Sequence, residues 1–150
     1  MIRTLAGTTL ALALGACGTD FTVASTPLAG TVGGQPWTFV AGETNAFLSE
    51  GENDFFAELY AATFTPCGFS SPSGNHLIVA VPKEPGEYDF SLSLNMTFVV
   101  GGSENLVATD GVVIVDEVTP TLVRGGLHGK FDGDNEVDGR FELTVCADTQ

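Results

Sequence analysis

Apolar and polar residues alternate through most of this chain, and this alternation constrains the fold more than any other feature. It is clearest in residues 136–146, where every second residue is apolar or glycine. One set is Val137, Gly139, Phe141, Leu143 and Val145, and the other is Glu136, Asp138, Arg140, Glu142, Thr144 and Cys146. Because successive side chains of a β-strand point to opposite faces, this pattern predicts a strand with one buried and one solvated face.

The same period of two recurs from residue 28 onward, interrupted about every ten residues by Gly, Pro, Asn or Asp. No segment shows a capped helical period. These patterns predict one all-β domain, residues 28–150, built as an antiparallel β-sandwich of about 8–10 strands, with a small closed β-barrel as the alternative. The expected strands are 28–32, 37–41, 55–65, 76–81, 88–95, 96–100, 106–109, 112–118, 121–131 and 136–146.

Two segments carry more specific expectations. Residues 55–65 are largely apolar on both faces, which predicts a central strand. Asp110-Gly111 stands between two apolar runs, and Asp-Gly is among the strongest signals for a two-residue β-hairpin. We therefore expect residues 106–109 and 112–118 to pair with each other through this turn.

The amino terminus has the layout of an export signal. Arg3 precedes the apolar run Leu5–Leu14 and two small residues, and this run is too short to span a membrane. Leu14-Gly15-Ala16-Cys17 resembles the lipobox of bacterial lipoproteins, in which the cysteine thiol receives a diacylglycerol and the chain is cut before it. The resemblance implies a signal peptide at 1–16 and a lipidated Cys17 followed by a flexible tether to residue 27. An ordinary secretory signal is the alternative.

With Cys17 assigned to lipid, Cys67 and Cys146 remain, and two cysteines of an exported protein usually form a disulfide. Cys146 falls on the polar face of its strand, so the bridge should hold the loop 66–75 over the outside of a sheet. A zinc site is the alternative. It needs four ligands, and His76 and His128 have no ligand-like spacing to the cysteines.

The formal net charge of −14 argues against nucleic acid or anionic lipid headgroups as partners. Within this charge, "DGDNEVDG" offers a weak Ca²⁺ candidate through Asp132, Asp134, Glu136 and Asp138. The EF-hand pattern fails, because Val145 occupies the place of its bidentate glutamate. A solvated hairpin tip is the simpler interpretation.

No catalytic motif is present, so no enzymatic activity and no cofactor are expected. The serines of "CGFSSPSG" lack the G-x-S-x-G arrangement, and neither histidine is tied to a nucleophile. Most aromatic residues alternate within strands and should lie in the core. They are Trp37, Phe39, Phe55, Phe56, Tyr60, Phe64, Tyr88, Phe90 and Phe98. Phe69, in the loop beside Cys67, is the aromatic residue expected to be exposed.

Three segments carry a further resemblance: Gly30-Thr-Val-Gly-Gly-Gln-Pro-Trp37, Gly129-Lys-Phe131 and Val137-Asp-Gly-Arg-Phe141. They are similar to segments of small bacterial lipoproteins with a β-sandwich domain of unknown function. The similarity covers most of residues 28–146 and implies a fold but no chemistry. We expect a binding or structural module, lipid-anchored outside the cytoplasm, with a protein, small-molecule or glycan partner. Gly18 after the cysteine favours the outer membrane, and a β-barrel carrier of a small apolar ligand is the alternative function.

Overall fold

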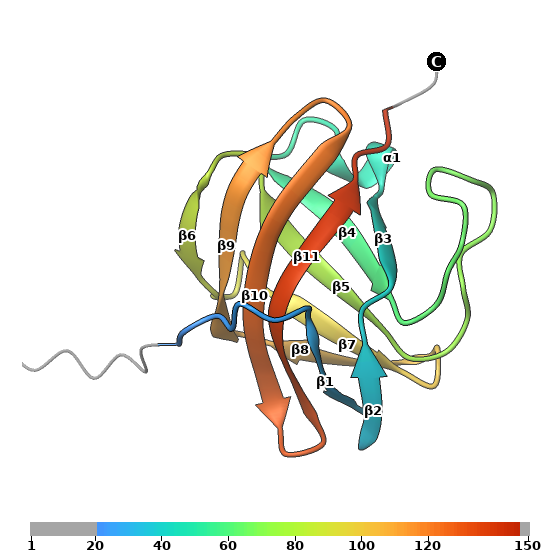
Figure 1. The fold of residues 1–150 in the computed structure, drawn as a ribbon, viewed down its shortest axis with the longest axis vertical. Helices are drawn as coiled ribbons and strands as arrows, with labels where there is room; N and C mark the ends of the chain where they lie inside the picture. The colour runs from blue at the N-terminus through green and yellow to red at the C-terminus, as the bar shows by residue number, and fades with distance from the viewer. Residues whose placement is uncertain (1–20, 148–150) are drawn as a thin grey trace, which may run out of the picture.

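The computed structural model describes residues 21–147, and β-strands dominate this part of the chain (Figure 1). The strands are β1 (Ala29–Val32), β2 (Gln35–Thr38), β3 (Ala41–Thr44), β4 (Asp54–Tyr60), β5 (His76–Pro82), β6 (Gly86–Asp89), β7 (Met96–Val100), β8 (Glu104–Ala108), β9 (Asp110–Val118), β10 (Leu122–Asp132) and β11 (Asn135–Thr144). One helix of a single turn, α1 (Ala46–Ser49), lies between β3 and β4. The predicted all-β fold is confirmed. None of the helices within residues 21–147 is long and apolar enough to cross a membrane.

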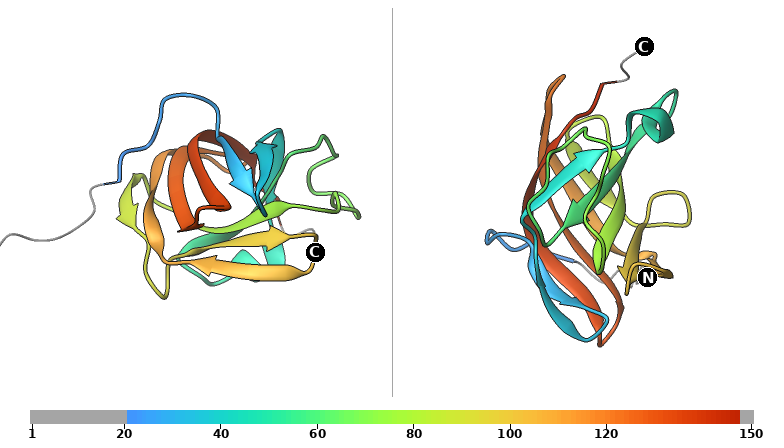
Figure 2. Two further views of the ribbon diagram at one scale, coloured as in Figure 1. Left: turned by 90° about the horizontal axis from the view of Figure 1, so that it is seen from below. Right: turned by 90° about the vertical axis from the view of Figure 1, so that its right-hand side faces the viewer.

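All eleven strands belong to one sheet. Its main path runs β6-β9-β10-β11-β3-β4-β5-β7-β8, and β1 and β2 extend it from β11. The sheet curls into a half-barrel, so that β8 at one end lies against β10 (Figures 1 and 2). This arrangement is intermediate between the expected sandwich and a closed barrel. The neighbours are antiparallel except β11 and β3, which pair in parallel at Thr144 and Glu43.

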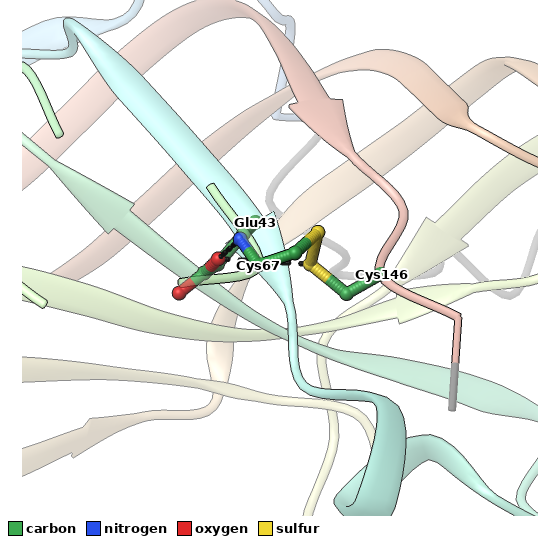
Figure 3. Close-up of side chains that lie close together, drawn as sticks. All are labelled: Glu43, Cys67 and Cys146. Atoms are coloured by element: carbon green, nitrogen blue, oxygen red, sulfur yellow. Dashed lines mark hydrogen bonds between the residues drawn. A yellow bond between two sulfur atoms is a disulfide. The ribbon is translucent and has the colours of Figure 1, made fainter. Parts of the chain in front are cut away.

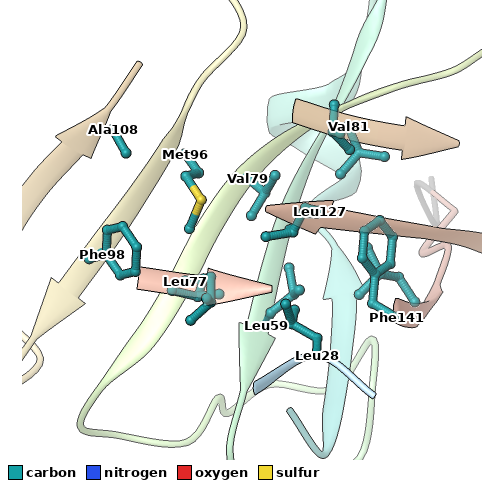
Figure 4. Close-up of a cluster of buried hydrophobic side chains, with 14 of the residues drawn as sticks. Leu28, Leu59, Leu77, Val79, Val81, Met96, Phe98, Ala108, Leu127 and Phe141 are labelled. Carbon is teal, nitrogen blue, oxygen red and sulfur yellow. The ribbon is translucent and has the colours of Figure 1, made fainter. Parts of the chain in front are cut away.

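The hollow of the curled sheet is filled with apolar side chains (Figure 4). Val137, Phe141 and Leu143 of β11 are buried there, as their alternation predicts. The central position of β4, between β3 and β5, is also confirmed. Fully buried residues of the core are Leu28, Val32, Ala57, Leu59, Leu77, Val79, Val81, Met96, Phe98, Val113, Val123, Leu127, Val137 and Leu143.

The strand expected at 88–95 is wrong beyond Asp89, where β6 ends. The next residues form a turn in which the backbone N–H of Ser91 donates to the carbonyl of Leu94. The Ser91 hydroxyl accepts from the N–H groups of Ser93 and Leu94, at 3.3 and 3.1 Å. Such local hydrogen bonds compete with a strand ladder. Leu92, expected to face the core, is therefore 91% exposed.

The hairpin expected at Asp110-Gly111 is also wrong. β8 pairs with β7, whereas β9 pairs with β6 and β10, so the segments on either side of this dipeptide are not neighbours. Gly111 lies inside β9 with φ +148°, and a Cβ there would stand 2.2 Å from the carbonyl oxygen of His128. The glycine allows β10 to approach closely instead of turning the chain.

Residues 21–27, here called the strap, lie across the outer face of β10 and β11. The Phe21 ring packs edge-on against His128, and the Ala24 N–H donates to Asp138 at 2.8 Å. The Arg140 N–H donates to the carbonyl of Thr26, also at 2.8 Å. The expected flexible tether, 17–27, is thus bound to the sheet from Phe21 onward. Cys17 and the signal peptide lie outside the described residues.

We expect Gly139→Ala to detach the strap and destabilise the domain by about 1–3 kcal/mol. Gly139 has φ +136°, and an added Cβ would lie 2.6 Å from the carbonyl oxygen of Thr26 and 2.7 Å from Leu28 Cα. Urea unfolding and the rate of proteolysis within 21–27 measure the effect. Gly133→Ala is the matched control, because nothing lies within 4 Å of that position. Equal unfolding midpoints for the two variants would contradict this account.

Candidate functional site

The sheet is weakest between β11 and β3, and the disulfide lies at this seam. The ladder between the two strands consists of the single pair Thr144–Glu43. Cys67 and Cys146 form the predicted disulfide there, with Cα atoms 5.4 Å apart. The Cys146 N–H donates to the Thr44 hydroxyl at 3.0 Å. As predicted, the bridge holds the loop after β4 against the outside of the sheet, where it secures the end of β11.

Glu43 is a nearly buried carboxylate against this bridge, 8% exposed (Figure 3). Its Oε2 accepts a hydrogen bond from the Cys67 N–H and lies 3.6 Å from Cys146 Sγ. A disulfide sulfur carries no proton, so the second contact is packing and not a hydrogen bond. Within residues 21–147 these three side chains are the only set close enough to share a metal ion. The disulfide removes both thiolates from that set.

Residues 67–75, within the loop that follows β4, are held at both ends. Cys67 is bound through the disulfide, and Asn75 links the other end to two turns of the sheet. The Asn75 side chain donates to the carbonyl of Val32 at 2.7 Å and accepts from the Gly101 N–H at 2.8 Å. Its backbone carbonyl accepts from the Trp37 indole. These contacts fix the segment that carries Phe69.

A groove of about 280 Å³ opens beside the bridge, between α1 and the loop. We call it the disulfide groove; its lining residues are Glu43, Thr44, Asn45, Ala46, Phe47, Glu58, Cys67, Gly68, Cys146 and Ala147. Phe47, on the α1 side, is 79% exposed. Phe69 directly follows Gly68 of the loop wall and is fully exposed. A groove with one exposed phenylalanine in its lining and a second next to a lining residue in the sequence is a candidate interaction surface, whereas single exposed apolar residues are ordinary.

The exposure of Phe69 confirms the prediction from the sequence. Trp37, Tyr60, Phe90 and Phe98 are buried, and most other aromatic residues expected in the core are partly buried against it. The exposure of Phe47 was not predicted, because the single turn of α1 is too short to show a helical period of apolar residues in the sequence. The available signal was Asn45, whose Oδ1 accepts from the Leu48 N–H at 3.0 Å as a helix N-cap.

The Ca²⁺ candidate does not assemble in the described part of the chain. Asp132 Oδ1 accepts from the N–H of Asp134 and the side chain of Asn135, which stabilises the turn. Glu136 accepts from Lys130 at 2.7 Å, and this bond lowers its pKa. Asp138 holds the strap. Each of these acids except Asp134 has a structural partner, and the four do not converge on one point.

The two histidines lie in different surroundings. His76 stacks on the Tyr60 ring with centroids 5.0 Å apart, and its Nδ1 lies 2.9 Å from the carbonyl oxygen of Gly74. Burial raises the pKa of Tyr60. His128, on the outer face of β10, contacts the strap and Glu136. In the described chain neither histidine contacts a serine hydroxyl, so no nucleophile–base pair is formed there.

A larger cleft, of about 560 Å³, is lined by Glu52, Asn53, Asp54, Pro82, Lys83, Glu84, Tyr88, Ser93 and Leu94. Burial raises the pKa of Asp54, and the charge of Lys83 opposes this shift. The Lys83 ammonium is already bound to the carbonyls of Ser49 and Glu52 and lies over the Phe55 ring. The lining of this cleft has no highly exposed aromatic side chain, whereas Phe47 in the lining of the disulfide groove is 79% exposed. The disulfide groove is therefore the stronger candidate.

Comparison of the chain with protein-family models, with curated proteins and with solved structures gave no match.

Proposed function

We propose that this protein is a lipid-anchored, extracytoplasmic binding module whose binding surface is the disulfide groove. The observation that carries the proposal is the exposure of Phe47, which lines that groove, together with that of Phe69, which directly follows the lining residue Gly68. Burying a phenylalanine side chain contributes roughly 1.5–3 kcal/mol relative to leaving it in water. Because both rings stay exposed in the folded chain, this free energy of burial is available to a partner that covers them.

The location outside the cytoplasm rests on two independent features. A structural disulfide such as Cys67–Cys146 is typical of oxidising compartments. The sequence Leu14–Cys17 resembles a lipobox, which implies a diacylglycerol at Cys17. Two or more acyl chains hold a protein at a bilayer far more firmly than one.

An anchor at Cys17 would leave the disulfide groove turned away from the bilayer. Cys17 stands four residues before Phe21, so the lipid would lie within about 14 Å of the strap. A domain of this size has a radius of gyration of about 14 Å, so its diameter exceeds that reach at least twofold. The strap and α1 lie on opposite sides of the molecule (Figures 1 and 2). The groove beside α1 is then free to meet a partner in the aqueous compartment.

The alternative, a carrier of a small apolar ligand, has less support. Such a carrier needs an open interior. The hollow of the sheet is instead packed with large side chains, among them Met96, Phe98 and Leu127 (Figure 4). Both clefts described above open at the surface.

Native mass spectrometry of the protein purified from its source membrane tests the proposal. We expect a chain that begins at Cys17, an added diacylglycerol mass, the loss of two protons in the disulfide, and a retained partner. Phe47→Ser/Phe69→Ser should keep the lipid and lose the partner, whereas Leu92→Ser, which removes an equally exposed apolar residue elsewhere, should keep both. An intact chain that still carries Met1 and three free thiols would overturn the proposal.

A further inference from the structure

Resting on the proposed function, we infer that the disulfide groove binds a basic polypeptide segment, in which a Lys or Arg side chain is flanked by apolar residues. The cation would lie between Glu43 and Glu58, and the apolar residues would cover Phe47 and Phe69. The inference comes from the register of two strands, the distribution of cations over the sheet, and the exposed rings.

Glu43 and Glu58 are directly opposite each other on neighbouring strands. In the antiparallel ladder of β3 and β4, Glu43 pairs with Glu58, and both line the groove. Like charges directly opposite in a ladder destabilise a sheet. Glu43 is nearly buried and Glu58 half-buried, so water screens this repulsion less than it would at an open surface.

No basic residue of the described chain offsets this pair. None of the ion pairs within residues 21–147 involves Glu43 or Glu58. They join Arg124 to Glu117 and Glu142, Lys130 to Glu136, and Arg140 to Asp116, and the His128 ring contacts Glu136 and Asp138. Lys83, the remaining described cation, is bound to backbone carbonyls at the end of α1. Two paired carboxylates without a cation are an arrangement that costs stability and attracts a positive charge.

The rings distinguish a polypeptide from a simple ion. Phe47 lines the groove on its α1 side, so a cation between the glutamates would share the groove with an exposed aromatic ring. Phe69, which directly follows the lining residue Gly68, is a second exposed ring on the loop. An aromatic face attracts Lys and Arg side chains and also buries apolar neighbours. A metal ion would satisfy the carboxylates and leave both rings exposed.

The negative charge of the chain also favours a basic polypeptide over other large molecules that could cover the groove. A second copy of this chain carries the same formal net charge of −14 and would be repelled, as would an anionic bilayer. A bilayer at the anchor would in addition lie on the strap side of the molecule. A basic segment with apolar anchors satisfies both the carboxylates and the rings, and long-range attraction would speed its association.

The test uses the full-length, disulfide-bonded protein with Cys17→Ser and a fluorescein-labelled, end-capped peptide of alternating Arg, Leu and Phe. We expect saturable, salt-sensitive binding, measured by fluorescence anisotropy. Two matched peptides, one with Gln for Arg and one with Ser for Leu and Phe, should each bind at least about tenfold more weakly. One removes the cation and the other removes the apolar anchors.

Variants of the protein distinguish binding at the groove from attraction by the overall negative charge of the chain. Glu58→Gln and Phe47→Ser/Phe69→Ser should each weaken binding at least about tenfold. Glu87→Gln and Leu92→Ser, which change exposed residues far from the groove, should change it less than about twofold. Glu58→Gln should also unfold at an equal or higher urea concentration than the parent, because it relieves the repulsion from Glu43. A loss of binding by misfolding would instead lower that midpoint.

The remaining outcomes overturn the inference. Equal weakening by Glu87→Gln and Glu58→Gln would mean unspecific charge attraction. Displacement of the peptide by 1 mM CaCl₂ (a concentration of about 10⁻³ M, as for weak extracellular calcium sites), together with calcium binding that Glu58→Gln abolishes, would assign the carboxylates to a metal. The peptide could fail to bind while native mass spectrometry still finds a partner that is lost in Phe47→Ser/Phe69→Ser. That result would overturn the inference of a basic partner and leave the proposed function in place. An unlipidated chain in the membrane preparation would count against the proposed function instead.

Discussion

Replacing both Cys67 and Cys146 with alanine is expected to lower the free energy of unfolding by about 4.5 kcal/mol, one of the two largest changes we predict. The bridge joins residues 79 apart, so removing it restores the freedom of a long loop to the unfolded chain. Small domains are stable by only about 5–15 kcal/mol in total. The variant should therefore be marginally folded at 25 °C.

Interactions of the folded state that depend on the bridge add to this loss of stability. The disulfide lies where β3 and β11 are joined by the single residue pair Glu43–Thr144. Without the bridge, the loop can withdraw the Cys67 N–H from Glu43 and leave a nearly buried carboxylate short of a donor. The seam between β3 and β11 would also lose its covalent link. We thus expect unfolding, when partial, to begin at β3 and the end of β11.

Urea unfolding of the double variant, compared with the parent under oxidising and reducing conditions, measures this effect. Cys17→Ser is the matched control, since it removes a cysteine outside the bridge and should leave the midpoint unchanged. Protection of amide hydrogens in β3 should fall before that in β5. A change of less than about 1 kcal/mol would show that the packing of the seam, and not the bridge, holds β11 in place.

The faces of the strands could be predicted from the sequence, because a shift by one residue would expose a whole buried set. That reasoning placed Val137, Phe141 and Leu143 in the core and Cys146 on the outside. It therefore also predicted that the disulfide lies on the outer side of the sheet. Phe69 followed from the same logic, as an aromatic residue in a segment without alternation.

The order of the strands could not be predicted in this way, because alternation reports a face and not a neighbour. Asp110-Gly111 has a hairpin signature, yet β8 and β9 lie in different parts of the sheet. The opposition of Glu43 and Glu58 depends on the register of β3 and β4, which no local pattern encodes. The features of the candidate site that matter most to its function are thus the ones set by long-range pairing.

Phe98→Ala is expected to destabilise the domain by about 3–5 kcal/mol, whereas Phe69→Ala should change its stability by less than about 0.5 kcal/mol. The two substitutions remove the same atoms. Phe98 is fully buried between Leu77 and Leu106 of the neighbouring strands, and Phe69 is fully exposed. Chemical denaturation of both variants measures the difference, and similar losses would show that the loop around Phe69 packs more tightly than its exposure indicates.

The same pair of variants tests whether the interior has room for a ligand. Removing a buried phenylalanine leaves an apolar cavity, and such cavities take up small apolar molecules such as benzene. Benzene should therefore raise the unfolding midpoint of Phe98→Ala and leave the parent and Phe69→Ala unchanged, because the parent hollow is already filled (Figure 4). Equal stabilisation of all three proteins would show that the parent interior admits apolar ligands, and the carrier function would then have the better support.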